Sequence, residues 1–245
     1  MSLLIDADYI LYKNAAACET EVDFGDNVIV VSSRFSDLQR ALQRDLDSIV
    51  NGLNWPLNDD LILFFSDTKN FRKDIYPDYK GHRNRKKPCG YRRAISWLQS
   101  EFDVRIFPNL EADDAMGIVQ TSEPEADHII VSPDKDMRQI PGRLYDPNKQ
   151  TLTTVTPEAG RRWHLMQTLT GDQTDGYGGC PGIGEVKGEK LLDKEGESWS
   201  TVVGAFTKAG LTEDDALLNA RLAKILTADL YDHSSRTFQL WTPAS

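Results

Sequence analysis

The sequence is poor in thiol and imidazole groups, with three cysteines and four histidines among its 245 residues. Cys18, Cys89 and Cys180 are odd in number and widely spaced, and they contain no C-x-x-C pair. We therefore expect neither a disulfide framework nor a thiolate metal site. The histidines are equally dispersed.

Long apolar runs are also missing. The strongest run, Leu61 to Phe65, is far too short to span a bilayer. Met1 to Asp6 lacks the basic flank of a signal peptide, so we expect a cytoplasmic protein without a membrane partner. A hydrophobic content of 40% is enough for a sizeable core, in one large domain or in one domain with a smaller companion.

The net charge of −10 argues against a nucleic-acid partner, but the distribution of charge reverses that conclusion. Ten basic residues lie between Lys69 and Arg93, where only two aspartates oppose them. A solvated loop is one interpretation of this basic segment. The interleaved aromatic residues favour another, because they offer stacking surfaces to unpaired bases: Phe71, Tyr76, Tyr79 and Tyr91.

Acidic residues follow the predicted buried strands. Strands are expected at 3–5, 60–66 and 128–131, and an acid or an acidic pair begins within three residues after each. Further acids open a predicted helix at 111–121 and occupy a turn at 171–176. Together they form one candidate site of nine carboxylates: Asp6, Asp67, Glu111, Asp113, Asp114, Asp134, Asp136, Asp172 and Asp175.

Nine gathered carboxylates would repel one another unless cations lay among them, so the cluster predicts bound divalent metal. Oxygen ligands favour Mg²⁺ or Mn²⁺ over zinc. Each group alone has an ordinary explanation, since acids are common in the first turn of a helix and in turns after strands. Their joint occurrence after three successive strands favours a metal site.

Alternating strands and helices predict an α/β fold with a mostly parallel central sheet flanked by helices. The pattern also indicates a hairpin at 20–31, helices at 35–53 and 91–102, and a strand at 104–107. From residue 157 the chain is mainly helical, with helices expected at 157–169, 187–192, 198–208 and 213–229. We place a domain boundary there, giving a core of residues 1–156 and a helical region of residues 157–245.

A glycine-rich turn, residues 179–188, leads into one of these helices. It is either an ordinary turn between helices or part of a helix-turn-helix that grips a DNA backbone through the amides at the start of the second helix.

These motifs, in this order, resemble the 5′-nuclease superfamily, which includes flap endonucleases, the 5′-nuclease domain of DNA polymerase I and phage 5′→3′ exonucleases. The chain is most similar to the exonucleases of T-seven-like podoviruses. The segments that carry the resemblance are Leu4-Ile-Asp6-Ala-Asp8, Phe65-Ser-Asp67, Asn70-Phe-Arg72, Tyr79-Lys80-Gly-His-Arg83, Leu110-Glu-Ala-Asp-Asp114, Ser132-Pro-Asp-Lys-Asp136, Leu169-Thr-Gly-Asp172-Gln-Thr-Asp175, Arg161 to Thr168, Asp175 to Gly178 and Leu240 to Pro243.

The resemblance implies two metal sites. Asp6, Asp67, Glu111, Asp113 and Asp134 match the first. Asp136, Asp172 and Asp175 match the second, with Asp134 shared between them and Asp114 a supporting acid. The implied cofactors are two Mg²⁺ or Mn²⁺ ions.

The resemblance also implies DNA contacts. Lys80 and Arg83 match a cationic pair below a helical arch, here within residues 69–93, that contacts the scissile phosphate, and Tyr79 matches an aromatic residue beside it. The basic segment adds Arg72, Arg85, Lys86 and Lys87 as expected contacts. Gly182, Gly184 and Gly188, with Lys187, match a helix-turn-helix that binds duplex backbone and a K⁺ ion, although Val186 stands where the family has a basic residue.

We therefore predict a metal-dependent 5′→3′ exonuclease that acts on duplex DNA ends, on flaps and on RNA paired to DNA, with replication proteins among its partners. Asp134 is predicted to be a catalytic residue together with Lys80 and Arg83. Alternatives are a flap endonuclease, a PIN-type endoribonuclease, a 3′→5′ exonuclease and a non-catalytic protein that binds DNA ends.

Overall fold

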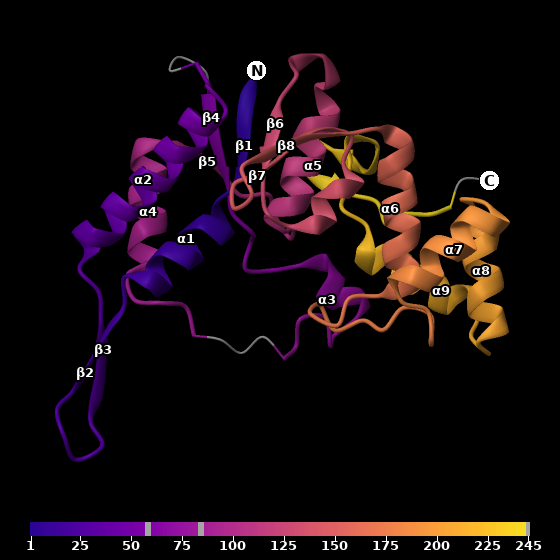
Figure 1. The fold of residues 1–245 in the computed structure, drawn as a ribbon, viewed down its shortest axis with the longest axis horizontal. Helices are drawn as coiled ribbons and strands as arrows, with labels where there is room; N and C mark the ends of the chain where they lie inside the picture. Colours follow the sequence, from indigo (N-terminus) through magenta and orange to yellow (C-terminus); the bar gives the residue numbers. More distant parts are fainter. Residues whose placement is uncertain (57–59, 83–85, 244–245) are drawn as a thin grey trace.

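The computed structural model describes residues 1–56, 60–82 and 86–243. Its centre is a six-stranded sheet in the order β5-β4-β1-β6-β7-β8 (Figure 1). All neighbouring strands are parallel except β7 and β8, so the mostly parallel sheet is confirmed. The strands are β1 (Ser2–Asp6), β4 (Asp60–Phe64), β5 (Asp103–Arg105), β6 (Ile129–Val131), β7 (Gly142–Asp146) and β8 (Thr151–Val155).

Helices cover both faces of the sheet, and the alternation of side chains along β1 decides which core each residue joins. Leu3 and Ile5 pack against α1 (Ala7–Ala17), α2 (Phe35–Gly52) and α4 (Tyr91–Glu101). Leu4 points to the other face, where it packs with Ile62, Phe64 and α5 (Ala112–Ser122). All five residues of β1 are buried, which fits a central strand of a parallel sheet.

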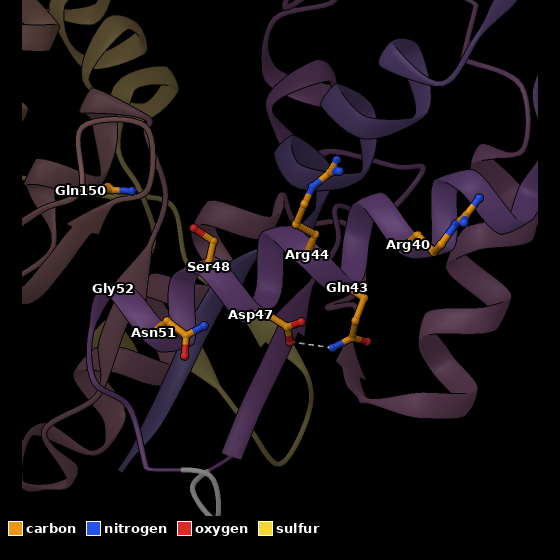
Figure 2. Close-up of a pocket in the computed structure, with 8 residues that line it drawn as sticks. All are labelled: Arg40, Gln43, Arg44, Asp47, Ser48, Asn51, Gly52 and Gln150. Carbon is orange, nitrogen blue, oxygen red and sulfur yellow. Dashed lines mark hydrogen bonds between the residues drawn. The ribbon is translucent and has the colours of Figure 1, made fainter.

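The predicted amphipathic helix is α2. Its inward face buries Leu38, Leu42, Leu46 and Ile49. Figure 2 shows the opposite, polar face, where Gln43 donates a hydrogen bond of 2.9 Å to Asp47. A shallow pocket of about 690 Å³ lies along this face and reaches the turn between β7 and β8: Arg40, Gln43, Arg44, Asp47, Ser48, Asn51, Gly52 and Gln150. None of the nine candidate acids lines it.

The predicted hairpin is also present, as β2 (Thr20–Asp23) and β3 (Ile29–Ser32), and it projects from the body of the molecule (Figure 1). The sequence did not indicate the second hairpin, β7 and β8. Every residue of β8 before Val155 is exposed, so this polar edge strand lacks the alternation of a half-buried strand.

From residue 157 on, the chain is mainly helical as expected: α6 (Pro157–Thr170), α7 (Glu185–Glu195), α8 (Trp199–Lys208) and α9 (Glu213–Ala223). These helices lie together on one side of the sheet (Figure 1). Short elements complete the fold: η1 (Pro124–Ala126), η2 (Lys135–Gln139), η3 (Ala228–Leu230), β9 (Tyr231–Asp232) and β10 (Thr237–Phe238). Among the described helices, none is long and apolar enough to cross a membrane.

The last predicted helix, 213–229, is too long, because α9 ends at Ala223. The chain then returns to the sheet domain. Ile225 packs beside α5, and Leu226 packs against Phe71 and Ile118. The boundary at residue 156 therefore remains an interpretation of composition, since residues 225–226 complete the core of the first part.

The basic segment does not form the expected helical arch in the residues that the structure describes. Only α3 (Phe71–Ile75) and the start of α4 are helical, while residues 77–82 and 89–90 form turns.

A buried ion pair holds α3 in place. Both terminal nitrogens of Arg72 donate to the carboxylate of Asp114 in α5, at 2.7 and 2.8 Å. The same guanidinium donates to the backbone carbonyls of Leu222 and Lys224 at the end of α9. Asp114 is fully buried and also accepts the amide of Leu226. One ion pair thus joins the basic segment, α5 and the C-terminal chain.

Arg72→Met should lower the free energy of unfolding by about 3–5 kcal/mol, because it leaves the Asp114 carboxylate buried without its partner. Arg40→Met is the control. Arg40 is exposed and pairs with Asp37 one turn away on α2, so its loss should cost less than about 1 kcal/mol. Urea unfolding measures both; a loss below about 1 kcal/mol for Arg72→Met would contradict this role of the pair.

Candidate metal centre and active site

The predicted acids gather at the carboxyl ends of the parallel strands. A cavity of about 580 Å³ opens there, between α1, β4, α4 and α5. All five acids predicted for the first metal site line it, together with two lysines: Asp6, Asp67, Glu111, Asp113, Asp134, Lys80 and Lys87.

Asp6 and Asp134 are linked by the hydroxyl of Ser132. That hydroxyl donates to Asp6 Oδ2 at 3.0 Å and accepts the amide of Asp134 at 3.1 Å. Asp6 also accepts the amide of Tyr9, so Asp6 is the N-cap of α1. Ser132 was not among the predicted site residues, because a serine after a strand is also expected in an ordinary turn.

The acids of the first group repel one another strongly. Burial raises the pKa of Asp6 to about 7, and the charges of Asp8 and Asp134 add to the shift. Burial likewise raises the pKa of Asp113 well above its usual range, with further contributions from Asp6, Asp134 and Glu111. Ionised carboxylates in such surroundings require a compensating cation.

The second group lies around Asp136. Burial raises its pKa to about 7, followed by the charges of Asp134, Asp172 and Asp175. In the described part of the chain, Asp136 Oδ1 is buried and accepts no hydrogen bond. A buried carboxylate oxygen without a donor is unusual, and a metal ion would satisfy it. Asp134 raises the pKa of acids in both groups, so it lies where the two groups meet.

Lysine 80 compensates part of this charge. Its ammonium lies 2.5 Å from Glu111 Oε1 and 3.6 Å from Asp175 Oδ2. Burial alone would raise the pKa of Glu111, but Lys80 and then Arg72 outweigh it and lower the pKa to about 2. Among the described residues, no group of three or more Asp, Glu, His or Cys side chains is oriented so that it could hold a metal ion. Metal binding therefore requires some carboxylates to turn toward the ion.

Asp67 lies at the rim of the cavity. Its carboxylate accepts the amides of Thr68 and Asn109, at 2.6 and 2.8 Å. The amide of Asn109 is the main reason that its pKa is lowered. Asp67 is therefore ionised at neutral pH.

Two predicted DNA contacts, Arg72 and Tyr79, are wrong, and Asp114 can act only as a supporting acid. Asp114 is not available as a metal ligand, because Arg72 and two backbone amides take up both of its oxygens. Arg72 is buried against it and contacts no DNA surface. Tyr79 is only 1% exposed, so its ring cannot stack on a base. Its hydroxyl oxygen instead lies 3.0 Å from Glu111 Oε2 and 2.9 Å from Asp175 Oδ2, and its single proton is shared between these two acceptors.

The other basic residues differ in position. Arg83 and Arg85 lie outside the described residues. Lys86 is exposed, and Lys87 lies at the cavity that holds the first group of acids.

The glycine-rich turn leads into α7, with Gly184 as N-cap. Gly182 adopts a φ of +76°, in the left-handed region that favours glycine. Lys187 donates to the carbonyl of Gly182 at 2.8 Å. Gly188 was expected to contact DNA, but it is buried, and a Cβ there would come within 2.7 Å of the Met166 sulfur. Its role is therefore close packing of α7 on α6.

Comparison with known proteins gives a consistent result. The exodeoxyribonuclease of Enterobacteria phage T3 is 29% identical, with 99% of this chain and 93% of the relative covered. The exonuclease of Escherichia phage T7 is 28% identical, with 98% and 93% covered. In both cases, the similarity spans almost the whole of the two chains.

Solved structures show the same fold at lower identity. A phage T5 5′-exonuclease superposes with a TM-score of 0.66 at 12% identity, over 91% of this chain and 87% of that one. A phage T5 flap endonuclease, solved with DNA and metal ions, gives 0.66 at 13% identity, over 91% and 89%. The family model described as 5′-3′ exonuclease, N-terminal resolvase-like domain, matches residues 1–160. With that match over more than half of its length, the chain belongs to the 5′-3′ exonuclease family and is a nuclease.

Proposed function

We propose that this protein is a 5′→3′ exonuclease that hydrolyses phosphodiester bonds at DNA 5′ ends with two Mg²⁺ or Mn²⁺ ions and releases 5′-phosphorylated products. The observation that carries the proposal is the position of Asp134 between two groups of mutually repelling acids. The substrates include duplex ends, flaps and RNA paired to DNA. The family match and the phage exonucleases at 28–29% identity support the reaction.

The residues present fit two metal ions. Asp6, Asp113 and Asp134 would hold one, with Glu111 and Asp67 close by. Asp136, Asp172 and Asp175 would hold the other, together with Asp134. The unpartnered oxygen of Asp136 and the raised pKa values of both groups support this division. The ions would supply activation of water and stabilisation of the departing oxygen.

The chain itself supplies positive charge for the phosphate. The Lys80 ammonium lines the cavity and is positioned by Glu111 and Asp175. Its backbone is fixed as well, since the Lys80 amide donates to the carbonyl of Asp175 at 2.8 Å. Lys80 thus stands ready to neutralise charge on the scissile phosphate in the transition state. Arg83 is expected to act with it, three residues further along the segment.

Duplex binding is assigned to the start of α7. Gly182 and Gly184 have open space around them, so a phosphate can approach the backbone amides closely. The turn between α6 and α7 would then act as the helix-turn-helix that the sequence predicts. The Lys187 ammonium already binds the Gly182 carbonyl, so we propose that this lysine supports the turn in the role expected of K⁺.

A structure-specific flap endonuclease is the second candidate, favoured by the fold shared with the phage T5 enzyme. The two activities are separated by the size of the first product from a 5′-labelled flap. Mononucleotides indicate an exonuclease, and release of the whole flap indicates an endonuclease.

Asp134→Asn should reduce cleavage of a 5′-ended duplex by at least about a hundredfold, since it weakens both metal sites and each ion contributes several kcal/mol of charge stabilisation. DNA binding should stay within about tenfold, because the basic segment and the turn are unchanged. Single-turnover kinetics in Mg²⁺ and fluorescence anisotropy measure the two effects. Asp103→Asn, on the edge strand β5, is the control and should cleave normally. Near-normal turnover by Asp134→Asn would refute the two-metal assignment.

The metal-free protein should lose stability as pH rises from about 5 to 8. Acids with raised pKa values keep their protons to a higher pH in the folded state than in the unfolded state. Ionising them above pH 4 therefore lowers the free energy of unfolding, by on the order of several kcal/mol at pH 8. The lowered pKa values of Glu111 and Asp67 matter only at lower pH, where their protonation removes stability.

Urea unfolding with EDTA at pH 5 and pH 8 measures this loss, and Mg²⁺ at pH 8 should restore stability. Asp134→Asn should show a smaller loss, because Asp134 raises the pKa of Asp6, Asp113 and Asp136. Equal pH dependence in the two proteins would contradict the charge coupling proposed here.

Lys80→Ala should lower the single-turnover cleavage rate by about a hundredfold and weaken binding far less. Gly184→Asp should do the reverse, since it adds a negative charge where amides meet the duplex, and saturating enzyme should recover much of the rate. Gly204→Asp on α8 makes the same change in open space elsewhere and is the matched control. Loss of affinity alone in Lys80→Ala would show that Lys80 only attracts DNA.

A further inference from the structure

Asp8 is the acid of the cavity that the two-metal assignment leaves unused. It lies two residues after Asp6, at the start of α1, and lines the same cavity. Its Oδ2 accepts the amide of Ser66 at 2.8 Å, and its Oδ1 accepts the hydroxyl of Tyr91 at 2.8 Å. Both oxygens are therefore engaged by donors of the chain, which suits a residue that positions others.

Tyr91 continues this chain of contacts to Lys87. It opens α4, its ring is 4% exposed, and its hydroxyl lies 3.4 Å from the Lys87 ammonium. Burial, with the neighbouring Asp8 charge, raises the pKa of Tyr91, so the hydroxyl keeps its proton and donates to Asp8. Its oxygen is then free to accept a hydrogen bond from Lys87.

Lys87 is exposed, and its ammonium contacts aromatic side chains. Its ammonium lies 4.4 Å from the centre of the Tyr91 ring and 5.9 Å from that of Tyr12. Among the described residues, no carboxylate lies within 4.0 Å of it, in contrast to Lys80, which Glu111 and Asp175 hold. Aromatic faces fix an ammonium without cancelling its charge. Lys87 therefore presents its ammonium at the cavity of the proposed metal centre without a carboxylate of the described residues in direct contact.

We propose that Lys87 binds a phosphate of the substrate strand next to the scissile phosphate, and that Tyr91 and Asp8 are positioning residues that hold its ammonium there. The inference rests on the proposed nuclease function, because it assumes that the scissile phosphate lies at the acids of the same cavity. Lys80 and Lys87 are seven residues apart in the basic segment, and both line this cavity. Two cations on one cavity suit two successive phosphates of one strand, of which the metals and Lys80 take one.

The test combines neutralised phosphates with protein variants. Three 5′-ended duplexes are compared in Mg²⁺ under single-turnover conditions: one unmodified, and two with a neutral methylphosphonate at the phosphate on either side of the scissile one. The proteins are the wild type, Lys87→Gln, Tyr91→Phe and Tyr9→Phe. Tyr9→Phe is the matched control, since it removes a hydroxyl from the same cavity whose partner is Asn148.

At one of the two positions, the methylphosphonate should slow the wild type and Tyr9→Phe by about tenfold or more, through loss of a charge-assisted contact. Lys87→Gln should cleave the unmodified duplex more slowly than the wild type does. The methylphosphonate should slow this variant by no more than about a further twofold, because the contact is already lost. Tyr91→Phe should fall between these limits. A purely structural role of Tyr91 would slow all three substrates equally.

Equal methylphosphonate sensitivity in the wild type and Lys87→Gln at both positions would overturn the assignment of Lys87 while leaving the nuclease function intact. Equal sensitivity in the wild type and Tyr91→Phe would overturn the positioning role. Failure of the wild type to cleave even the unmodified duplex would instead refute the proposed function, and this inference with it.

Discussion

The geometry of the candidate active site depends on one buried guanidinium. Arg72 binds Asp114 at the start of α5, and this fixes the turn that presents Glu111 and Asp113 to the cavity. It also binds two carbonyls at the end of α9, which brings the C-terminal chain against the sheet. Because a buried charge is stable only while its partners stay in place, these three segments are held in one arrangement. The acids can then lie close together despite their repulsion, since their backbones are fixed from outside the cluster.

Much of the fold could be predicted from local pattern. Short apolar runs followed by acids placed β1, β4 and β6 correctly, and a parallel sheet necessarily brings their carboxyl ends to one edge. The period of apolar residues placed α2 within one residue. The exposed strand β8 could not be predicted in this way, because it buries too little to show any alternation.

The sequence predicts which acidic residues gather at the site, but it does not predict the direction in which each side chain points. Asp113 and Asp114 are adjacent, yet one faces the cavity and the other faces Arg72. Tyr79 and Arg72 lie in a segment that looks solvated by composition, and both are buried. Their partners Glu111, Asp114 and Asp175 are far away in sequence, so no local pattern reveals which residues of a charged segment turn inward. The same limit applies to Tyr91, whose contact with Asp8 joins residues 83 positions apart.

The return of the chain to α5 after α9 has a consequence for biosynthesis. A growing chain that ends at residue 160 already carries Asp6, Glu111, Asp113 and Asp134, but the carbonyls of Leu222 and Lys224 that hold Arg72 are made much later. Asp172 and Asp175 are also still missing at that stage. Since domains fold as their last required segments emerge, we expect the candidate site to form only after residue 224 has been made. A chain that stops before residue 172 is therefore expected to lack a complete set of the candidate acids.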